Sequence, residues 1–271
     1  MANQVSVWQF FLILPANYRS PMIELLLQIQ AQMDGSRDGG PIYEETRNRL
    51  DQLIVEPLNG ISAALFLIIV GYFGWKLRGQ FKKHSFLVVS TGILAIGGIG
   101  GTIYHLFRLY PIFLYMDWVP IMVLCLAACV FFYIKAGGKW TVPAAALIGY
   151  FVLSTLLFNS FDTERPPQYL VNVNYALMAI LVLGPVYYIL YKTNFYKRQW
   201  VVYALVAFLA AITFRMLDAS DWVRLNLEGI GTHFLWHTFG AVACFAIFQY
   251  VYELGEMPEE QLIDKKEMVK V

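Results

Sequence analysis

The chain has 271 residues, of which 58% are hydrophobic and only 14% are charged, and its formal net charge at pH 7 is +1. This composition is too apolar for a typical soluble domain, and the near-zero charge without a basic stripe excludes a nucleic-acid partner. The three cysteines lie in apolar stretches and supply no disulfide framework. The composition therefore predicts an integral membrane protein.

Residues 1–56 are predicted to form an amphipathic and juxtamembrane region. Ser20-Pro21 is typical of a helix start, and the apolar stripe after it predicts a helix that lies on the membrane surface. Residues 43–55 are rich in charge, which predicts a short juxtamembrane helix. Its apolar face would consist of Leu50, Leu53 and Ile54.

The next part of the chain, residues 57–253, is predicted to be an all-α domain of seven transmembrane helices. It contains seven apolar segments, each about the length needed to cross ~30 Å of hydrocarbon. They lie near residues 58–77, 85–108, 112–135, 141–160, 169–191, 199–217 and 231–252. Residues 254–271 are expected to form a charged cytoplasmic tail.

The orientation of the bundle is predicted from lysine and arginine in the short loops, which are enriched on the cytoplasmic side. The loops after the first, third and fifth segments are richer in these residues than the other three loops. The tail adds Lys265, Lys266 and Lys270 to the same side. We therefore expect the N-terminus outside and the C-terminus in the cytoplasm.

Three of the four histidines are predicted to lie at one depth near the outer side. His105 falls in the last turn of the outward second segment, whereas His233 and His237 occupy the first two turns of the inward seventh. Asp117 falls in the second turn of the third segment. At ~1.5 Å rise per residue, all four lie within roughly 10 Å of the outer interface. Three histidines and a carboxylate are the typical inventory of a catalytic zinc site.

Simpler interpretations remain for each residue taken alone. A single histidine near the interface is more often bonded to a carbonyl than to a metal, and Asp117 could merely interact with a helix dipole. The glycines at 97, 98, 100 and 101 allow close helix packing. The convergence of the four polar residues favours a metal site over these alternatives.

Five short motifs, in order, resemble those of the alkaline ceramidase family, which belongs to a membrane-hydrolase superfamily that also holds adiponectin-receptor-like and hemolysin III-like proteins. Together they span about residues 56–252. They are Glu56-Pro57-Leu58-Asn59-Gly60-Ile61-Ser62, Gly98-Ile99-Gly100-Gly101-Thr102-Ile103-Tyr104-His105, Asp117-Trp118-Val119-Pro120, Phe214-Arg215-Met216-Leu217-Asp218 and His233-Phe234-Leu235-Trp236-His237.

The resemblance implies a zinc-dependent hydrolase that cleaves the amide bond of ceramide or a similar lipid amide. His105, His233 and His237 would be the metal ligands, zinc-bound water the nucleophile, and Asp117 the catalytic acid and base. The implied partner is a membrane lipid, and no protein partner is predicted. Candidate oxyanion or substrate contacts are Gly101, Thr102, Tyr104, Arg215 and Trp236.

Two features depart from the family pattern. Gly101 replaces a serine that would help to hold the oxyanion, and losing one such donor typically costs ~10²–10³ in rate. The acidic calcium-binding cluster of the family is matched cleanly only at Glu56, so calcium is a weaker expectation than zinc.

Two alternative functions follow from the same residues. A receptor-like or lipid-binding protein would keep the metal for structure, and Gly101 would mark its lost catalysis. A small transporter would use the histidines and Asp117 as a proton relay, although the chain shows no internal repeat. In every case we expect a multi-pass protein of a bacterial inner membrane or a eukaryotic endomembrane, with its site towards the periplasmic or lumenal side.

Overall fold

The computed structural model describes residues 38–47, 49–135, 137–159 and 168–258, and within these ranges it contains helices and no strand. The predicted surface helix after Ser20 and most of the predicted tail lie outside the described residues. The helices are α3 (Pro57–Ala63), α4 (Leu65–Lys76), α5 (Ser85–Phe107), α6 (Pro111–Lys135), α7 (Thr141–Asn159), α8 (Gln168–Lys192), α9 (Arg198–Leu217), α10 (Asp221–Asn226) and α11 (His233–Glu256).

The seven predicted spans are confirmed as seven helical segments that are long and apolar enough to cross a membrane. The first span consists of α3 and α4, which are separated at Ala64 and continue one another. The boundaries lie close to the predicted ones, and the largest difference is at α11, which continues to Glu256 rather than 252. The short helix α10 was not predicted, although Ser220 at its N-cap is a typical start signal.

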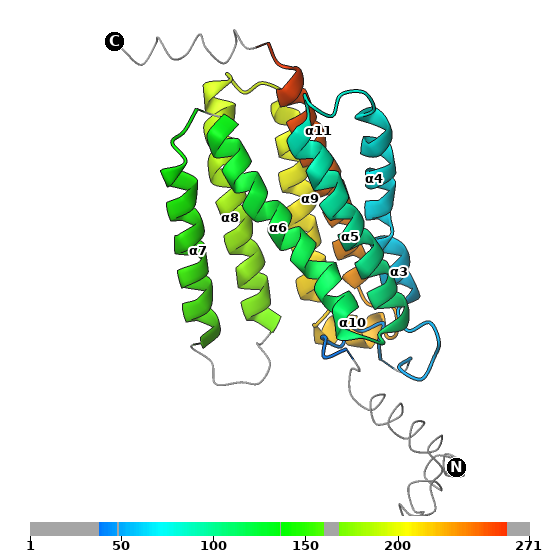
Figure 1. Ribbon diagram of the computed structural model, residues 1–271. Helices are drawn as coiled ribbons and strands as arrows, with labels where there is room; N and C mark the ends of the chain where they lie inside the picture. Colours follow the sequence, from blue (N-terminus) through cyan, green and yellow to red (C-terminus); the bar gives the residue numbers. More distant parts are fainter. Residues whose placement is uncertain (1–37, 48, 136, 160–167, 259–271) are drawn as a thin grey trace, which may run out of the picture.

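The helices form a bundle in which α11 is the most buried span and α7 the least (Figure 1). Helix α11 packs most extensively against α9, and α5 packs against α6. Helix α7 lies at the edge beside α8. One end of the bundle therefore gathers the start of α3, the end of α5, and the starts of α6 and α11.

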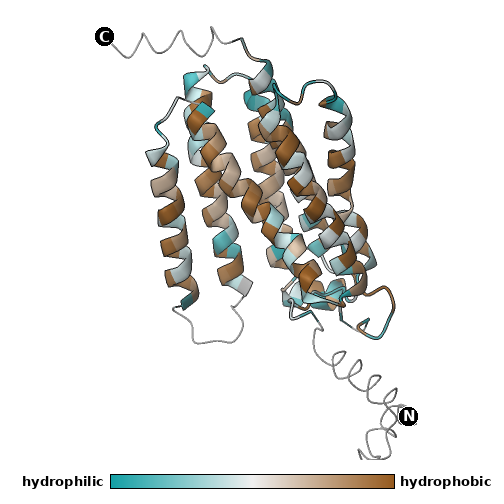
Figure 2. Ribbon diagram, viewed as in Figure 1, coloured by the Kyte–Doolittle hydropathy of each residue, from teal (hydrophilic) through white to brown (hydrophobic). Residues whose placement is uncertain are grey.

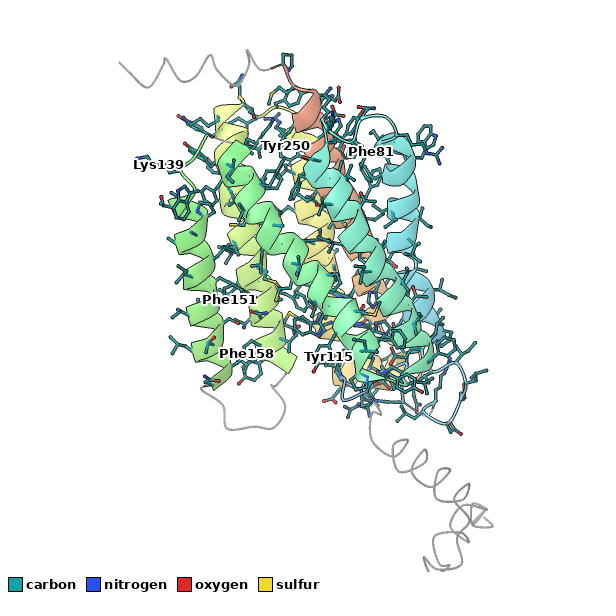
Figure 3. All side chains as sticks on the ribbon, in the orientation of Figure 1. Phe81, Tyr115, Lys139, Phe151, Phe158 and Tyr250 are labelled. Carbon is teal, nitrogen blue, oxygen red and sulfur yellow. The ribbon has the colours of Figure 1, made fainter. Side chains whose placement is uncertain are left out.

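The outer surface of the bundle is apolar over most of its height, with polar residues concentrated near the ends (Figure 2). Side chains such as Ile68, Ile148 and Val206 are largely exposed although they are hydrophobic. Figure 3 shows Phe151 on the edge helix and Lys139 near one end of the bundle. A continuous apolar surface of this kind is stable against lipid and not against water.

The helix predicted over residues 43–55 is wrong, because the structure has turns and bends there. The predicted apolar face is also not the buried one: Leu53 is 81% exposed, whereas Glu44 and Glu45 are 3% and 1% exposed. Glu45 accepts from the backbone N–H groups of Leu58 and Asn59 in α3, and Glu44 pairs with Arg47 of its own segment. The tertiary contacts of Glu45 outweigh local helix propensity.

Two glycines of α5 allow α6 to approach closely. A Cβ atom added at Gly100 would overlap Met116, and one added at Gly101 would overlap Oδ1 of Asp117. Small residues let transmembrane helices approach backbone to backbone. In this protein the close approach brings Asp117 towards the end of α5, where His105 lies.

Candidate metal centre

The three histidines predicted to converge do meet at one end of the bundle. His105 comes from the last turn of α5, and His233 and His237 come from successive turns of α11. One ring nitrogen from each lies within 4.8 Å of the others, and the residues are only 0%, 2% and 4% exposed. Among the described residues, this is the one group of three such side chains that could hold a metal ion.

The donor atoms of this cluster fit a metal better than they fit an ordinary polar core. Nε2 of His105, Nδ1 of His233 and Nε2 of His237 are buried without a hydrogen-bond partner. An unsatisfied buried polar atom costs about 1–3 kcal/mol, and three in one cluster are unusual. A metal ion on the three nitrogens would remove this cost, because neutral imidazole is a common ligand of first-row metals.

Glu56 holds His105 from the side opposite to the cluster. Its Oε2 atom lies 2.5 Å from Nδ1 of His105 and also accepts from Asn59 Nδ2 at 2.9 Å. A carboxylate on Nδ1 favours the tautomer in which Nε2 carries the free lone pair. Burial disfavours the charge of Glu56, but His105 and Arg108 outweigh it and lower the pKa of this carboxyl to about 2.

Asp117 borders the cluster on a more open side. Its Oδ2 atom lies 3.9 Å from Nε2 of His105, and its side chain is 19% exposed, whereas that of His105 is fully buried. A water molecule or a substrate group can therefore reach Asp117 beside the histidine nitrogens. This is the position that a proton-transferring carboxylate would need.

Tyr43 and Arg215 complete the surroundings of the cluster. The Tyr43 ring stacks on His233 with centroids 3.7 Å apart, and burial raises the pKa of its phenol above the ordinary value. The Arg215 guanidinium lies over the rings of Tyr175 and Trp236 at 5.1 and 5.2 Å and donates to Asn172. No carboxylate of the described residues lies within ion-pair distance of Arg215, so its charge stays available near the cluster.

Two carboxylates without a predicted role hold the ends of helices at the site. Oδ1 of Asp218 accepts from the backbone N–H groups of Thr232 and His233 at 2.6 and 3.0 Å, at the start of α11. Glu45 does the same at α3, where it accepts from Leu58 and Asn59. Each acts as a capping carboxylate supplied by a distant segment, so no local capping motif could reveal it.

The remaining predicted contacts are placed as follows. The Thr102 hydroxyl donates to the Gly98 carbonyl of its own helix at 2.6 Å. The Tyr104 ring is buried against His105, but its hydroxyl lies near Gly40, in the segment before α3. Gly101 faces Asp117. Their proposed contacts with substrate remain predictions.

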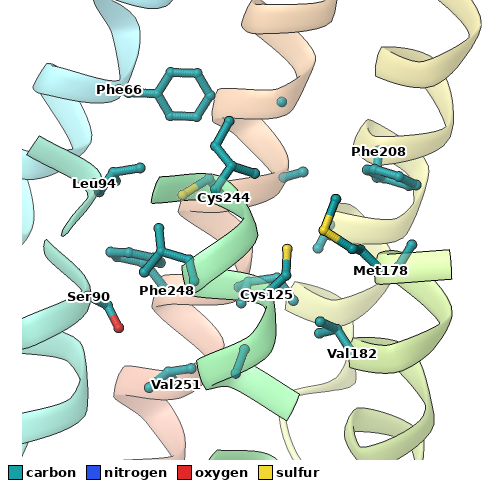
Figure 4. A pocket seen from close by; sticks show the side chains of 18 of the residues that line it. Phe66, Ser90, Leu94, Cys125, Met178, Val182, Phe208, Cys244, Phe248 and Val251 are labelled. Carbon is teal, nitrogen blue, oxygen red and sulfur yellow. The ribbon is translucent and has the colours of Figure 1, made fainter. Parts of the chain in front are cut away.

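An apolar cavity of about 230 Å³ lies between the helices of the bundle (Figure 4), and His237 is the one residue of the histidine cluster that lines it. His237 and Trp236 line one end, and Phe248 and Val251 of the same helix line the other. This stretch of α11 covers about four turns, or roughly 22 Å. The cavity is therefore long relative to its volume. Further lining side chains, labelled in Figure 4, include Ser90, Leu94, Cys125, Met178 and Phe208.

The candidate calcium residue, Glu56, has its two oxygens directed at protein donors. Oε1 accepts from Thr46 and Arg108, each at 2.5 Å, while Oε2 contacts Asn59 and His105. The arginine supplies the positive charge beside this carboxylate. Calcium binding stays a prediction, which these contacts do not support.

The chain matches no family model, and no curated protein or solved structure is detectably similar to it. The assignment of a function therefore depends on the geometry of the site and on the motifs of the sequence.

Proposed function

We propose that this protein is a zinc-dependent hydrolase within the membrane that cleaves the amide bond of ceramide or a similar lipid amide. The observation that carries the proposal is the buried cluster of His105, His233 and His237 beside Asp117, in which each histidine has one ring nitrogen without a hydrogen-bond partner. Three histidine ligands and an open position are typical of catalytic zinc. Bound there, zinc would act as a Lewis acid and make water nucleophilic at neutral pH.

Three side chains of the protein have the remaining roles in this reaction. Asp117 accepts a proton from the attacking water and returns it to the nitrogen of the leaving amine, which needs one mobile carboxylate within reach of both. Arg215 lies in the same buried region without a carboxylate partner, and it stabilises the negative charge that develops on the carbonyl oxygen. Glu56 keeps His105 in the tautomer and orientation that a metal ligand requires.

The apolar cavity supports a lipid as the substrate. It reaches from His237 to Val251 and is lined almost entirely by apolar side chains, so it suits an extended acyl chain whose polar end stays at the histidines. A substrate that enters from the bilayer needs no aqueous channel. The proposed site lies on the periplasmic or lumenal side.

The test combines metal analysis with an assay of fatty-acid release. Protein purified in detergent without chelator should contain about one zinc per chain and should release fatty acid from ceramides in a panel of lipid amides and esters. A His233→Ala/His237→Ala variant should lose both the zinc and the activity. Well-folded protein without any metal would contradict the hydrolase and would favour a proton relay.

Gly101 favours one second candidate, a receptor-like or lipid-binding protein in which the metal is structural. Such a protein would contain the same zinc but would release no fatty acid from any member of the panel. Measuring metal and product on the same sample therefore separates the two functions.

A further inference from the structure

Arg108 occupies an unusual place at the end of α5. It is the C-cap residue, with a left-handed backbone conformation (φ 51°), and its side chain is almost completely buried. Residues other than glycine and asparagine adopt this conformation at a cost. An arginine at such a position needs compensation, and here its side-chain contacts provide it.

The guanidinium joins two buried carboxylates that are far apart in the sequence. Nε and Nη2 donate to Asp38 at 2.6 and 3.0 Å, and Nη1 donates to Oε1 of Glu56 at 2.5 Å. The two-point contact with Asp38 has the fork geometry that makes arginine–carboxylate pairs strong and directional. These contacts raise the pKa of Arg108 further above its ordinary value, although burial alone would lower it.

The chain of contacts continues to the metal cluster. Glu56 meets Arg108 through Oε1 and His105 through Oε2, which leaves Nε2 of His105 free on the opposite side of the ring. We propose that Arg108 is a positioning residue of the metal centre, which, anchored by Asp38, holds Glu56 in the orientation that aligns His105. This inference builds on the proposed metal site and adds residues that no sequence motif indicated.

The physical reason is the charge of Glu56. A carboxylate that loses one partner in a buried site is left uncompensated, which is strongly unfavourable. Without Arg108, Glu56 would turn towards other donors or become neutral, and its contact with His105 would weaken. Loss of an outer partner of this kind typically reduces metal affinity 10–100-fold.

A purely structural role for Arg108 makes a different prediction. If the arginine only ties the segment around Asp38 to α5, then Asp38→Asn should harm the metal site as much as Arg108→Met. If it positions Glu56, Arg108→Met should weaken binding 10–100-fold, while Arg108→Lys, which keeps the charge beside Glu56, should restore most of the affinity. Asp38→Asn should weaken metal binding less than Arg108→Met does and more than Arg108→Lys does.

The experiment is a titration of zinc or cobalt into metal-stripped, full-length protein in detergent. Arg224→Met serves as the matched control, because Arg224 is half-exposed on α10 and pairs only with Asp221 among the described residues. Equal affinities for the wild type, Arg224→Met and a folded Arg108→Met would overturn the proposal.

A triple variant keeps the test valid if Arg108→Met does not fold. In Arg108→Met/Glu56→Gln/Asp38→Asn the three buried charges of this network are removed together, and its metal affinity should equal that of Glu56→Gln, because Arg108 and Asp38 act through Glu56. An additional loss of about tenfold in the triple variant would show that Arg108 or Asp38 acts independently of Glu56 and would overturn the inference.

The inference also has a readout that needs no metal. In metal-free protein with ¹⁵N-labelled histidine, NMR should show His105 protonated at Nδ1 in the wild type and a mixture of tautomers in Arg108→Met. If the wild type binds no metal, the proposed function fails, yet this comparison still decides the role of Arg108. An unchanged His105 signal in the variant would contradict that role.

Discussion

Nδ1 of His105 lies 2.5 Å from Oε2 of Glu56, and neither side chain is accessible to solvent. The two residues are 49 positions apart, and the contact joins the end of α5 to the start of α3. It determines which nitrogen of His105 faces His233 and His237. The orientation of His105 in the histidine cluster therefore depends on a residue outside the cluster.

Replacing Glu56 with glutamine should weaken metal binding 10–100-fold. The amide keeps the shape of the side chain, but it removes the charge that fixes the His105 tautomer. It also replaces one acceptor oxygen with an N–H₂ group, which cannot accept hydrogen bonds from the surrounding donors. Competition with a calibrated chelator measures the affinity. Glu253→Gln, at the opposite end of the bundle, should bind metal like the wild type, and equal binding by both variants would contradict this role of Glu56.

Asp117→Asn should reduce the turnover of a lipid amide by about 10²–10⁴-fold, the usual contribution of a general acid–base group, while zinc content stays the same. Asparagine has the same size but cannot accept the proton. Kinetics and metal analysis on one preparation give both values, with Asp221→Asn as an exposed control. Substantial turnover by Asp117→Asn would assign the proton transfer to another group.

Gly101→Ala should reduce activity by roughly tenfold or more, because the added methyl group displaces the Asp117 carboxylate and a misplaced catalytic group loses rate steeply. The activity of Gly101→Ser should fall by a similar amount, since serine adds the same Cβ atom together with a hydroxyl group. Gly92→Ala is the matched control on the same helix, where nothing lies within 4 Å of an added Cβ. If serine increased hydrolysis while alanine did not, Gly101 would mark a decayed catalytic site instead.

Asp218→Ala should lower the free energy of unfolding by about 1 kcal/mol, the usual value of a helix N-cap. The carboxylate caps the first turn of α11, where His233 lies, so metal affinity should fall as well. Denaturation in mixed micelles measures the stability, and Asp221→Ala provides an exposed comparison. Unchanged stability would show that water replaces the cap.

Ala243→Phe should reduce activity on long-chain amides by roughly tenfold, the usual scale of overpacking, while sparing short-chain ones. Ala243 lines the apolar cavity, whereas Val242, next to it on α11, is exposed at the surface of the bundle. A phenyl group at 243 fills part of the space that the acyl chain needs. Val242→Phe is the control, because it shows whether α11 accepts a phenylalanine at a neighbouring position outside the cavity. Equal loss for all chain lengths would indicate that the acyl chain binds elsewhere.

The sequence by itself determined the membrane class, the seven spans and the convergence of the three histidines. Hydropathy is summed locally over about twenty residues, so helix positions follow from composition alone. The four-residue spacing of His233 and His237 places them on one helix face. The alternation of helix direction then brings His105 to the same depth, because each span crosses the same thickness of membrane.

Only the tertiary structure decided which groups surround the histidines. Residues 43–55 resembled an amphipathic helix, yet Glu44 and Glu45 are buried and Leu53 is exposed, because Glu45 caps α3 and Thr46 donates to Glu56. No motif of the sequence indicated a role for Arg108. Hydrogen bonds and ion pairs between distant residues leave no periodic pattern in a chain, and the burial that strengthens them exists only after the helices have packed.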